Sequence, residues 1–569
     1  MSRALVGLST LGLTAVGSVG LASPASAGTF AVTTTADSGP GSLRQAISDA
    51  NASPGPDTIA IDPALTGTIS FSSTSTSMDI TDPVTITGPG STKLTIEAGG
   101  FDRIFSVDAG TAAATTISGL ELTGGDQNSD GGALYANASE LVLQDMALTD
   151  NNSSSYGGAI YAYQGELTIS GSMITGNTSR NGAGVYAYDG SFDITDSVVS
   201  GNTASEWGGG LYLVDGTATL TRTLVTTNHA DSVAGVFAGN TTVEVVDSVV
   251  SGNTATNDAG GMAFFQAPAT VTGSTISSNT AASGAAVLTS YGSQLAVTNS
   301  TITGNGGAGP VVQLERSAST PAGTASFDHV TMAGNTGGTA GIRTDTAASL
   351  SIANSIVYGN GSGDDLVDGG FPTTVTHSLF GVTSDVTNGT DGNLVGVDPQ
   401  LGTLQNNGGP TDTMLPSITS PVIDAGEVPY TATPTDQRGL PRVATRASTS
   451  APVTDMGAVE FADSDRTLPP PGGSGSGGGS GSGGSSSGGS SSGTGSPGAV
   501  ASPGATGSGL TGGSGPRSAA SPALAYTGTD LSVLLPTAGG LLAGGGLLIL
   551  FGARFRRRRK LVADPTPTA

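Results

Sequence analysis

The stretch that decides the fold reads SMITGNTSRNGAGVYAYDG at residues 172–190 and returns as SVVSGNTASEWGGGLYLVDG at residues 197–216. One asparagine marks each copy, and these asparagines recur at gaps of 25, 25, 26, 25, 26, 26, 30 and 25 residues: Asn152, Asn177, Asn202, Asn228, Asn253, Asn279, Asn305, Asn335 and Asn360. A period near 25 residues, with β-branched runs between Gly, Asn and Ser turns, predicts a β-solenoid rather than a helical array.

The asparagine column itself predicts a structural ladder. Asparagine tolerates a left-handed turn conformation, and stacked amides at successive turns hydrogen-bond along the axis. We expect Asp126, 26 residues before Asn152, to begin the same column. No catalytic or metal-binding role is predicted for these residues.

The repeat also predicts which side chains face inward. One aliphatic column comprises Leu134, Ile160, Val185, Leu211, Val236, Met262 and Val287, and the residue two positions before each is Gly or Ala. Because side chains alternate between the two faces of a strand, both columns face the narrow interior.

The opposite face of the same strands carries aromatic residues. Stacked at about 4.8 Å per turn, they would form a row on the outside of the solenoid. Such a row suits stacking on sugar rings or anchoring a protein partner, although same-face aromatics also stabilise a sheet without any ligand. The candidate ligand-binding residues are Tyr135, Tyr161, Tyr163, Tyr186, Tyr188 and Tyr212.

Charge and cysteine content limit the partners. The chain has 19 Lys and Arg against 44 Asp and Glu, a formal net charge of −25, and it contains no cysteine. An acidic surface repels polyanions, so nucleic acid is not expected as a partner. Because no disulfide is available, stacking of the turns must hold the solenoid together.

Both ends of the chain carry targeting features. Residues 1–27 combine Arg3, an apolar stretch and the small residues Ala25, Ser26 and Ala27, which predicts a secretory signal peptide. Near the other end, an apolar span at residues 531–553 and a basic tail follow a short motif made of Leu524, Ala525, Tyr526, Thr527 and Gly528. The span is long enough to cross a bilayer, with the basic tail on the cytoplasmic side.

The C-terminal arrangement resembles a sortase sorting signal. The resemblance implies that Thr527 is linked to the cell wall and that sortase and peptidoglycan are partners. Ala525, in place of the usual proline, is similar to the variant used by high-GC Gram-positive bacteria. The expected location is therefore the wall of such a bacterium, and the alternative is a plain C-terminal membrane anchor.

The chain is thus expected to have five parts. They are a signal peptide (1–27), an N-terminal cap with the first rungs (28–100), a parallel β-helix with an irregular C-terminal part (101–462), a Gly/Ser/Pro-rich linker (463–523) and the sorting signal (524–569). The linker composition cannot bury a core and is typical of a flexible stalk.

The repeat at residues 115–360 resembles right-handed parallel β-helix proteins with the "GGA-aliphatic" repeats of polymorphic outer-membrane proteins. The segment TFAVTTTADSGPGSLRQAISDAN at residues 29–51 is similar to CSLREA-type segments, and residues 420–461 are similar to the end of choice-of-anchor β-helix proteins. These resemblances imply an all-β fold, a right-handed parallel β-helix with a short N-terminal helical cap. Ser42 would N-cap that helix, whose inner face comprises Leu43, Ala46, Ile47 and Ala50.

An enzyme is the main alternative, since β-helices include pectate lyases and polysaccharide hydrolases. Such enzymes need carboxylates beside a base, or two carboxylates across the scissile bond. In the repeat the basic residues are Arg180, Arg222, Arg316 and Arg343, none beside an evident acidic cluster.

Three further features of the sequence bear on possible chemistry. Asp189 and Asp215, each followed by glycine, are typical of turns, with a cation site as the alternative. His229, His329 and His377 share no short spacing, so no triad or zinc site is predicted. The sequence therefore predicts no catalytic residue, metal or cofactor. Trp207 is either a ligand contact or a loop plug.

Taken together, the sequence favours a non-catalytic, wall-anchored surface protein for adhesion. Its ligand would be an extracellular glycan or a protein on a host or neighbouring surface. One alternative is a secreted polysaccharide lyase or glycoside hydrolase, with its site in loops around residues 361–406. The other alternative is a structural spacer.

Overall fold

The computed structural model describes residues 27–282, 285–290, 292–315, 323–344, 349–370, 372–427, 434–442, 453–462 and 464–465. The chain divides into one unit from Met1 to Leu468 and another from Pro469 to Ala569, and every described residue lies in the first. Residues 1–26 of the predicted signal peptide, most of the linker and the whole sorting signal, with its motif and apolar span, lie outside the described residues.

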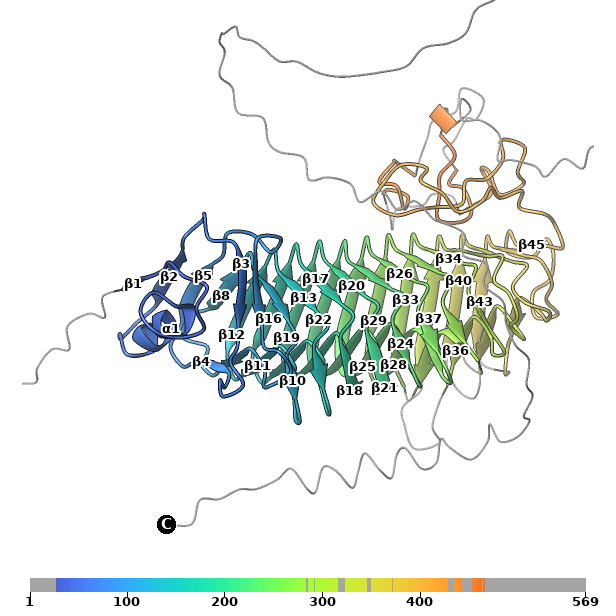
Figure 1. Ribbon diagram of the computed structural model, residues 1–569. Coiled ribbons are helices and arrows are strands. Elements are labelled where there is room, and N and C mark those ends of the chain that lie inside the picture. Colours follow the sequence, from blue (N-terminus) through green and yellow to red (C-terminus); the bar gives the residue numbers. More distant parts are fainter. Residues whose placement is uncertain are drawn as a thin grey trace, which may run out of the picture. The chain divides into compact units, whose positions relative to one another are not determined.

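The described chain is a solenoid of parallel strands in three sheets, which confirms the predicted fold class (Figure 1). Sheet A has 23 strands: β1 (Thr29–Val32), β2 (Asp57–Ile61), β4 (Met78–Ile80), β5 (Val84–Thr87), β7 (Phe105–Val107), β8 (Thr115–Ser118), β11 (Leu134–Asn137), β12 (Glu140–Gln144), β15 (Ile160–Tyr163), β16 (Glu166–Ser170), β19 (Val185–Thr195), β22 (Leu211–Thr221), β25 (Val236–Val246), β28 (Ala259–Phe265), β29 (Ala269–Thr272), β32 (Ala285–Ser290), β33 (Gln294–Thr298), β36 (Val312–Leu314), β37 (Thr324–Asp328), β39 (Ile342–Thr344), β40 (Ser349–Ala353), β42 (Leu366–Val367) and β43 (Thr373–Thr376).

The other two sheets are built from shorter strands. Sheet B has 14: β3 (Gly67–Ser70), β6 (Leu94–Glu97), β9 (Glu121–Thr123), β13 (Ala147–Thr149), β17 (Met173–Thr175), β20 (Val198–Ser200), β23 (Leu224–Thr226), β26 (Val249–Ser251), β30 (Thr275–Ser277), β34 (Thr301–Thr303), β38 (Thr331–Ala333), β41 (Ile356–Tyr358), β44 (Leu379–Phe380) and β45 (Leu394–Val395). Sheet C has eight: β10 (Asp126–Gln127), β14 (Asn152–Ser153), β18 (Thr178–Asn181), β21 (Thr203–Trp207), β24 (His229–Ala230), β27 (Thr254–Ala255), β31 (Thr280–Ala281) and β35 (Gly306–Gly307).

The predicted helical cap is α1 (Leu43–Asn51), at the N-terminal end of the stack in Figure 1. The Ser42 hydroxyl accepts a hydrogen bond from the Gln45 backbone N–H at 3.2 Å, which satisfies one free donor of the first turn. The helix buries the inner face that the sequence predicts, namely Leu43, Ala46, Ile47 and Ala50. It therefore covers the open end of the solenoid, where bare strand edges would invite aggregation.

The aliphatic column occupies the interior in the predicted register. Leu134 pairs with Ile160, Ile160 with Val185 and Val185 with Leu211, and all four are buried. The column of small residues has a more specific cause than a narrow interior. A β-carbon on Gly132 would lie 2.2 Å from the Gly158 carbonyl oxygen, so the backbone of the next rung excludes a larger side chain there.

An asparagine ladder runs along the corner between sheets B and C. Each amide nitrogen donates to the amide oxygen of the next member at 2.6–3.0 Å. The members are buried and comprise Asn151, Asn177, Asn202, Asn228, Asn253, Asn279, Asn305, Asn335 and Asn360. Asp365 ends the ladder by accepting from the Asn360 amide at 3.0 Å.

Two details of the ladder prediction are wrong. Asn152 and Asp126, which pair in register, both lie outside the ladder. The Asn152 side chain is exposed, donates to Asp126 at 2.8 Å and leaves the buried position to Asn151. The left-handed conformation belongs to the residue before each ladder asparagine, as at Gly176 (φ 70°) and Thr227 (φ 53°). Asparagine is needed here because its amide both donates and accepts.

A second ladder, which the sequence analysis missed, follows the corner between sheets A and B. In seven rungs of the described chain a serine hydroxyl accepts from the backbone N–H of the equivalent residue one rung earlier, as from Ser172 to Ser197 at 3.1 Å. The same hydroxyl donates to the carbonyl two residues before it, as from Ser197 to Thr195 at 2.8 Å. The sequence did contain a signal for this ladder, because the quoted repeats open with Ser172 and Ser197.

Beyond β45 the described residues form no further α-helix or strand. They return along the outside of sheet B, where Thr411 contacts Gly273 and Gln437 contacts Thr301. The hydroxyl of Thr275 donates to the Asp412 carbonyl at 2.7 Å, across 137 residues of chain. The irregular C-terminal part therefore covers one side of the solenoid instead of extending it.

Candidate functional site

Five aromatic rings form a continuous stack on the outer face of sheet A, one from each of five successive rungs. The strand register pairs each ring with the next. Successive centroids lie 5.3, 5.3, 4.8 and 4.4 Å apart, with interplanar angles of 10°, 13°, 8° and 21°. We call this stack the aromatic row; it comprises Tyr135, Tyr161, Tyr186, Tyr212 and Phe237.

A shorter pair lies two residues further along the same strands. Tyr163 and Tyr188 stack with centroids 5.6 Å apart and planes inclined by 3°. Val214 takes the next position in register and ends the pair. Burial raises the pKa of the Tyr188 phenol, and the charge of Asp215 and its hydrogen bond with Tyr188 raise it further.

The stacking geometry changes what the row offers to a ligand. Tyr161 lies between Tyr135 and Tyr186, so both of its faces are occupied. At the N-terminal end, the Arg103 guanidinium covers Tyr135 at 4.8 Å from the ring centroid. The expectation that sugar rings stack on these faces is therefore wrong for the interior rings. The surface that remains for a ligand is the partly exposed edge of each ring, and Tyr156 also packs against Tyr161 and Tyr186, with centroids 6.3 and 4.7 Å away.

Exposure falls along the row toward Phe237. Tyr135, Tyr161 and Tyr186 are half-buried, whereas Tyr212 is only 8% exposed and Phe237 5%. Trp207 packs edge-on against Phe237, with centroids 5.4 Å apart, and so acts as a plug. Tyr212, predicted to bind a ligand, is thus largely covered.

The phenols of the row are neutral hydrogen-bonding groups. Burial raises the pKa of Tyr161 and Tyr186 above the ordinary tyrosine value, so both keep their protons at physiological pH. In the described part of the chain, no tyrosine hydroxyl is buried without a hydrogen-bond partner. Each hydroxyl therefore meets either a protein group or solvent.

Two residues of opposite charge, Arg103 and Asp130, adjoin the Tyr135 end of the row. Burial raises the pKa of Asp130, while hydrogen bonds from the Ser155 side chain and the Tyr156 backbone, with the charge of Arg103, oppose the rise. Burial in turn lowers the pKa of Arg103. Sequence reasoning missed both residues because Arg103 precedes the regular repeat and Asp130 lies in a turn between sheets.

The other sequence candidates are turn residues or lie apart. Asp189 and Asp215 have φ values of 58° and 55°, share a left-handed column with Gln164, and lie at a bend inside β19 and β22. His229 is exposed in sheet C, whereas His329 is buried beside Asp328 at 2.9 Å. Among the described residues, no three His, Cys, Asp or Glu side chains are grouped to hold a metal ion.

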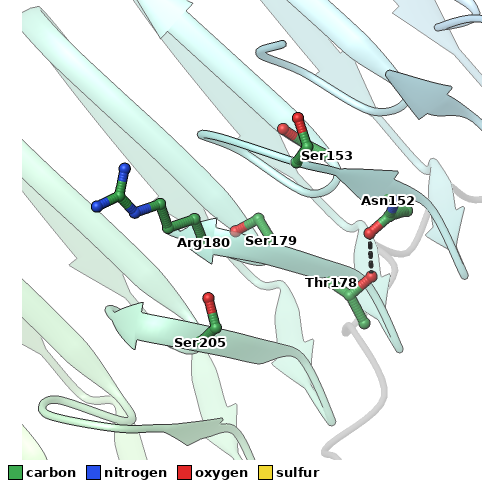
Figure 2. Close-up of a pocket in the computed structure, with 7 residues that line it drawn as sticks. Asn152, Ser153, Thr178, Ser179, Arg180 and Ser205 are labelled. Atoms are coloured by element: carbon green, nitrogen blue, oxygen red, sulfur yellow. Dashed lines mark hydrogen bonds between the residues drawn. The ribbon is translucent and has the colours of Figure 1, made fainter. Parts of the chain in front are cut away.

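A shallow polar hollow of about 320 Å³ lies on the outer face of sheet C (Figure 2). Asn152 accepts a hydrogen bond from the Thr178 hydroxyl at 2.7 Å across it. Arg180 lies at its edge and pairs with Glu206 at 2.7 Å. The other lining residues are serines, so no acid–base pair for catalysis faces this hollow.

Residues 222–380 match the model of the protein family described as "Right handed beta helix region". The fold is a right-handed parallel β-helix. No curated protein has a matching sequence. Within the described ranges, none of the helical structure of this β-helix is long and apolar enough to span a membrane.

Three solved structures resemble this β-helix. The A-module of the mannuronan C-5 epimerase AlgE4 from Azotobacter vinelandii is 14% identical, over 59% of this chain and 92% of that one, with a TM-score of 0.34. Pectate lyase Pel9A is 13% identical, over 77% and 97% of the two chains, with a TM-score of 0.33. Tailspike protein 3 of bacteriophage CBA120 is 12% identical, over 62% and 58%, with a TM-score of 0.30.

Proposed function

We propose that this β-helix is a non-catalytic surface protein that binds an extracellular glycan along the hydroxyl-bearing edge of the aromatic row. The observation that carries the proposal is the stack itself, which presents one ring per rung, half-buried from Tyr135 to Tyr186. Regular hydroxyls on a rigid scaffold suit an extended polymer whose own hydroxyls recur along the solenoid axis.

Charge favours a neutral glycan. The chain carries a formal net charge of −25. Asp130 adjoins the aromatic row, and Asp215 adjoins the Tyr163–Tyr188 pair. Anionic polymers would be repelled unless a cation intervened. The neutral phenols of Tyr161 and Tyr186 both donate and accept, as sugar hydroxyls do.

A glycan-array experiment on residues 28–468 tests this proposal. The double variant Tyr161→Phe/Tyr186→Phe keeps the stack and removes two hydroxyls. It should not bind the neutral glycans that the parent chain binds on the array. Tyr358→Phe, whose ring packs against a different cluster, is the matched control. Unchanged binding by the double variant would overturn recognition through the edge.

We further propose that the chain is secreted and attached to the cell wall at Thr527, on the strength of the sequence motif alone. The parent protein should resist detergent and be released by a muralytic enzyme. Thr527→Ala should move it to the detergent-soluble or culture fraction. Wall retention of this variant would contradict covalent attachment.

A second candidate is a polysaccharide lyase or hydrolase, favoured by the grouping of Arg103, Asp130 and Tyr135. A carboxyl with a raised pKa beside a cation and a phenol is a common acid–base arrangement. If it is catalytic, Asp130→Asn should abolish release of reducing ends while binding on the array persists. No release of reducing ends from any bound glycan by the parent protein would exclude this candidate.

A further inference from the structure

The C-terminal part of the β-helix, residues 411–465 as far as they are described, crosses the outside of sheet B. We call it the strap. At the first rung it meets, the Thr411 hydroxyl donates to the Gly273 carbonyl at 2.7 Å. Two rungs later, the Ala458 N–H donates to the Thr331 hydroxyl at 2.9 Å.

The strap therefore touches four successive rungs. The second of them is held by Thr301, whose hydroxyl donates to the Gln437 amide oxygen at 2.7 Å. The fourth is held by Asn354, whose backbone carbonyl accepts from the Gly457 N–H at 2.7 Å. These contacts join residues about 100 to 160 positions apart in the chain.

Gln437 is the central contact of the strap and is 2% exposed. Its amide nitrogen donates to the hydroxyls of Thr275 at 3.1 Å and Thr411 at 2.9 Å, while its oxygen accepts from Thr301. One side chain thus ties the strap to two neighbouring rungs. Leaving these buried hydroxyls without partners would be unfavourable.

The far end of the strap is tied back to the same place. Arg438 pairs with Asp436 at 3.0 Å and with Asp465 at 3.0 Å, and all three side chains are buried. Asp465 is the last residue that the structure describes, and it lies at the start of the predicted linker. Any pull transmitted through the linker therefore reaches Arg438, next to Gln437, before it reaches β45.

The outer face of sheet B has a different composition under the strap. In one register column, Val198, Leu224 and Val249 occupy the uncovered rungs. The same column continues as Thr275, Thr301 and Thr331 where the strap lies, and these three are buried. Three of the four covered rungs thus offer hydroxyls to the strap, and the fourth carries Ile356, which packs in one apolar cluster with Val422 and Met456.

We propose that the strap is a mechanical brace that distributes a pull on the C-terminal linker over four rungs. In a parallel solenoid the hydrogen bonds between rungs run along the axis, so a pull on the last strand opens them one rung at a time. A pull that enters through the strap loads several rungs together. The inference goes beyond ligand binding, and its test does not depend on wall attachment.

Single-molecule pulling of the full chain tests the brace. Because the sequence has no cysteine, each introduced cysteine is a unique point at which a pulling handle can be attached. One handle goes on Ser38→Cys near the N-terminus. The other goes either on Ser474→Cys in the linker, so that force enters through the strap, or on the exposed Val397→Cys directly after β45. The Val397 attachment should give low-force steps of roughly 90 Å, since about 25 residues extend by up to 3.6 Å each.

The Ser474 attachment should give a higher first-opening force and a larger first step. Gln437→Ala, and the near-isosteric Thr301→Val, should lower that force toward the Val397 value. The force–extension trace recorded through the Val397→Cys handle should be the same in each variant as in the parent chain. That result would show that the solenoid itself is intact. Equal first-opening forces from the two attachments in the parent chain, or an unaltered Ser474 force in both variants, would overturn the brace.

Discussion

At the scale of single residues, the β-helix depends on side chains that both donate and accept hydrogen bonds along its axis. Asn228, for example, donates to the Val199 carbonyl and to the Asn253 amide, each at 3.0 Å, and accepts from the Asn202 backbone N–H at 3.0 Å. These groups lie away from water, so each lost partner leaves a buried polar atom unsatisfied.

Asn228→Ala should therefore lower the free energy of unfolding by about 3 kcal/mol, since each unsatisfied buried group costs about 1–3 kcal/mol. Asn152→Ala is the matched control, because that side chain is exposed and should cost no more than about 0.5 kcal/mol. Urea denaturation of the two variants measures the difference. Similar losses at both positions would contradict the assignment of the ladder to Asn151.

Counting residues could not have made that assignment. The doublet of Asn151 and Asn152 gives a gap to Asn177 of either 26 or 25 residues, and both values occur elsewhere in the repeat. Only the backbone position, with Asp150 in the left-handed conformation (φ 52°), decides which of the two side chains points inward. The periodicity predicted the ladder, and the local turn determined its first member.

His329 makes stability depend on pH. Burial lowers its pKa to about 4, against the opposing hydrogen bond with Asp328, whereas an unfolded histidine titrates near 6.5. Between these values the unfolded chain binds more protons, so the free energy of unfolding falls as pH falls from 6.5 to 4. The full loss is on the order of 3 kcal/mol.

His329→Asn should remove this part of the acid sensitivity. Asparagine fits the position, since Asn299 and Asn354 hold the same left-handed conformation in the neighbouring rungs. Urea denaturation of parent and variant at pH 7 and pH 4.5 should show a smaller acid-induced loss in the variant. An equal loss in both proteins would show that other groups cause it.

At the scale of elements, regular units were predictable and irregular ones were not. Helix α1 was predicted with its cap and its inner face, because an amphipathic pattern after a serine is a local signal. The strap was not predicted, because its contacts to Thr275, Thr301 and Thr331 follow no period and join distant segments. For the aromatic row, alternation and the rung spacing predicted the shared face and the stacking, but not the cover that Arg103 and Trp207 give to its two ends.

The cap of α1 gives a local prediction. Ser42 is fully buried, donates to the Gly39 carbonyl at 2.8 Å and accepts from the Gln45 N–H. Ser42→Ala should lower the free energy of unfolding by about 1 kcal/mol, whereas the exposed mid-helix change Ser48→Ala should be neutral or slightly stabilising. Thermal denaturation measures both, and a larger loss for Ser48→Ala would contradict the capping role.

At the scale of the whole molecule, the repeat makes each rung nearly exchangeable. A solenoid is approximately a sum of repeat stabilities and nearest-neighbour interfaces, so removing one complete rung should preserve the fold. The register pairs Leu224 with Val249 and Val225 with Val250. Deleting residues 225–249 therefore puts Leu224 where Val249 was and leaves every column in phase.

In this shortened chain, Asn202 should donate to Asn253 and the ladder should continue without a gap. The free energy of unfolding should fall by roughly 1–4 kcal/mol, the share of about 25 residues at typical stability per residue. Deleting residues 225–236 instead removes half a rung and turns buried columns outward, so that chain should aggregate. Circular dichroism and size-exclusion chromatography distinguish the two. Equal folding of both deletions would mean that register does not hold the solenoid together.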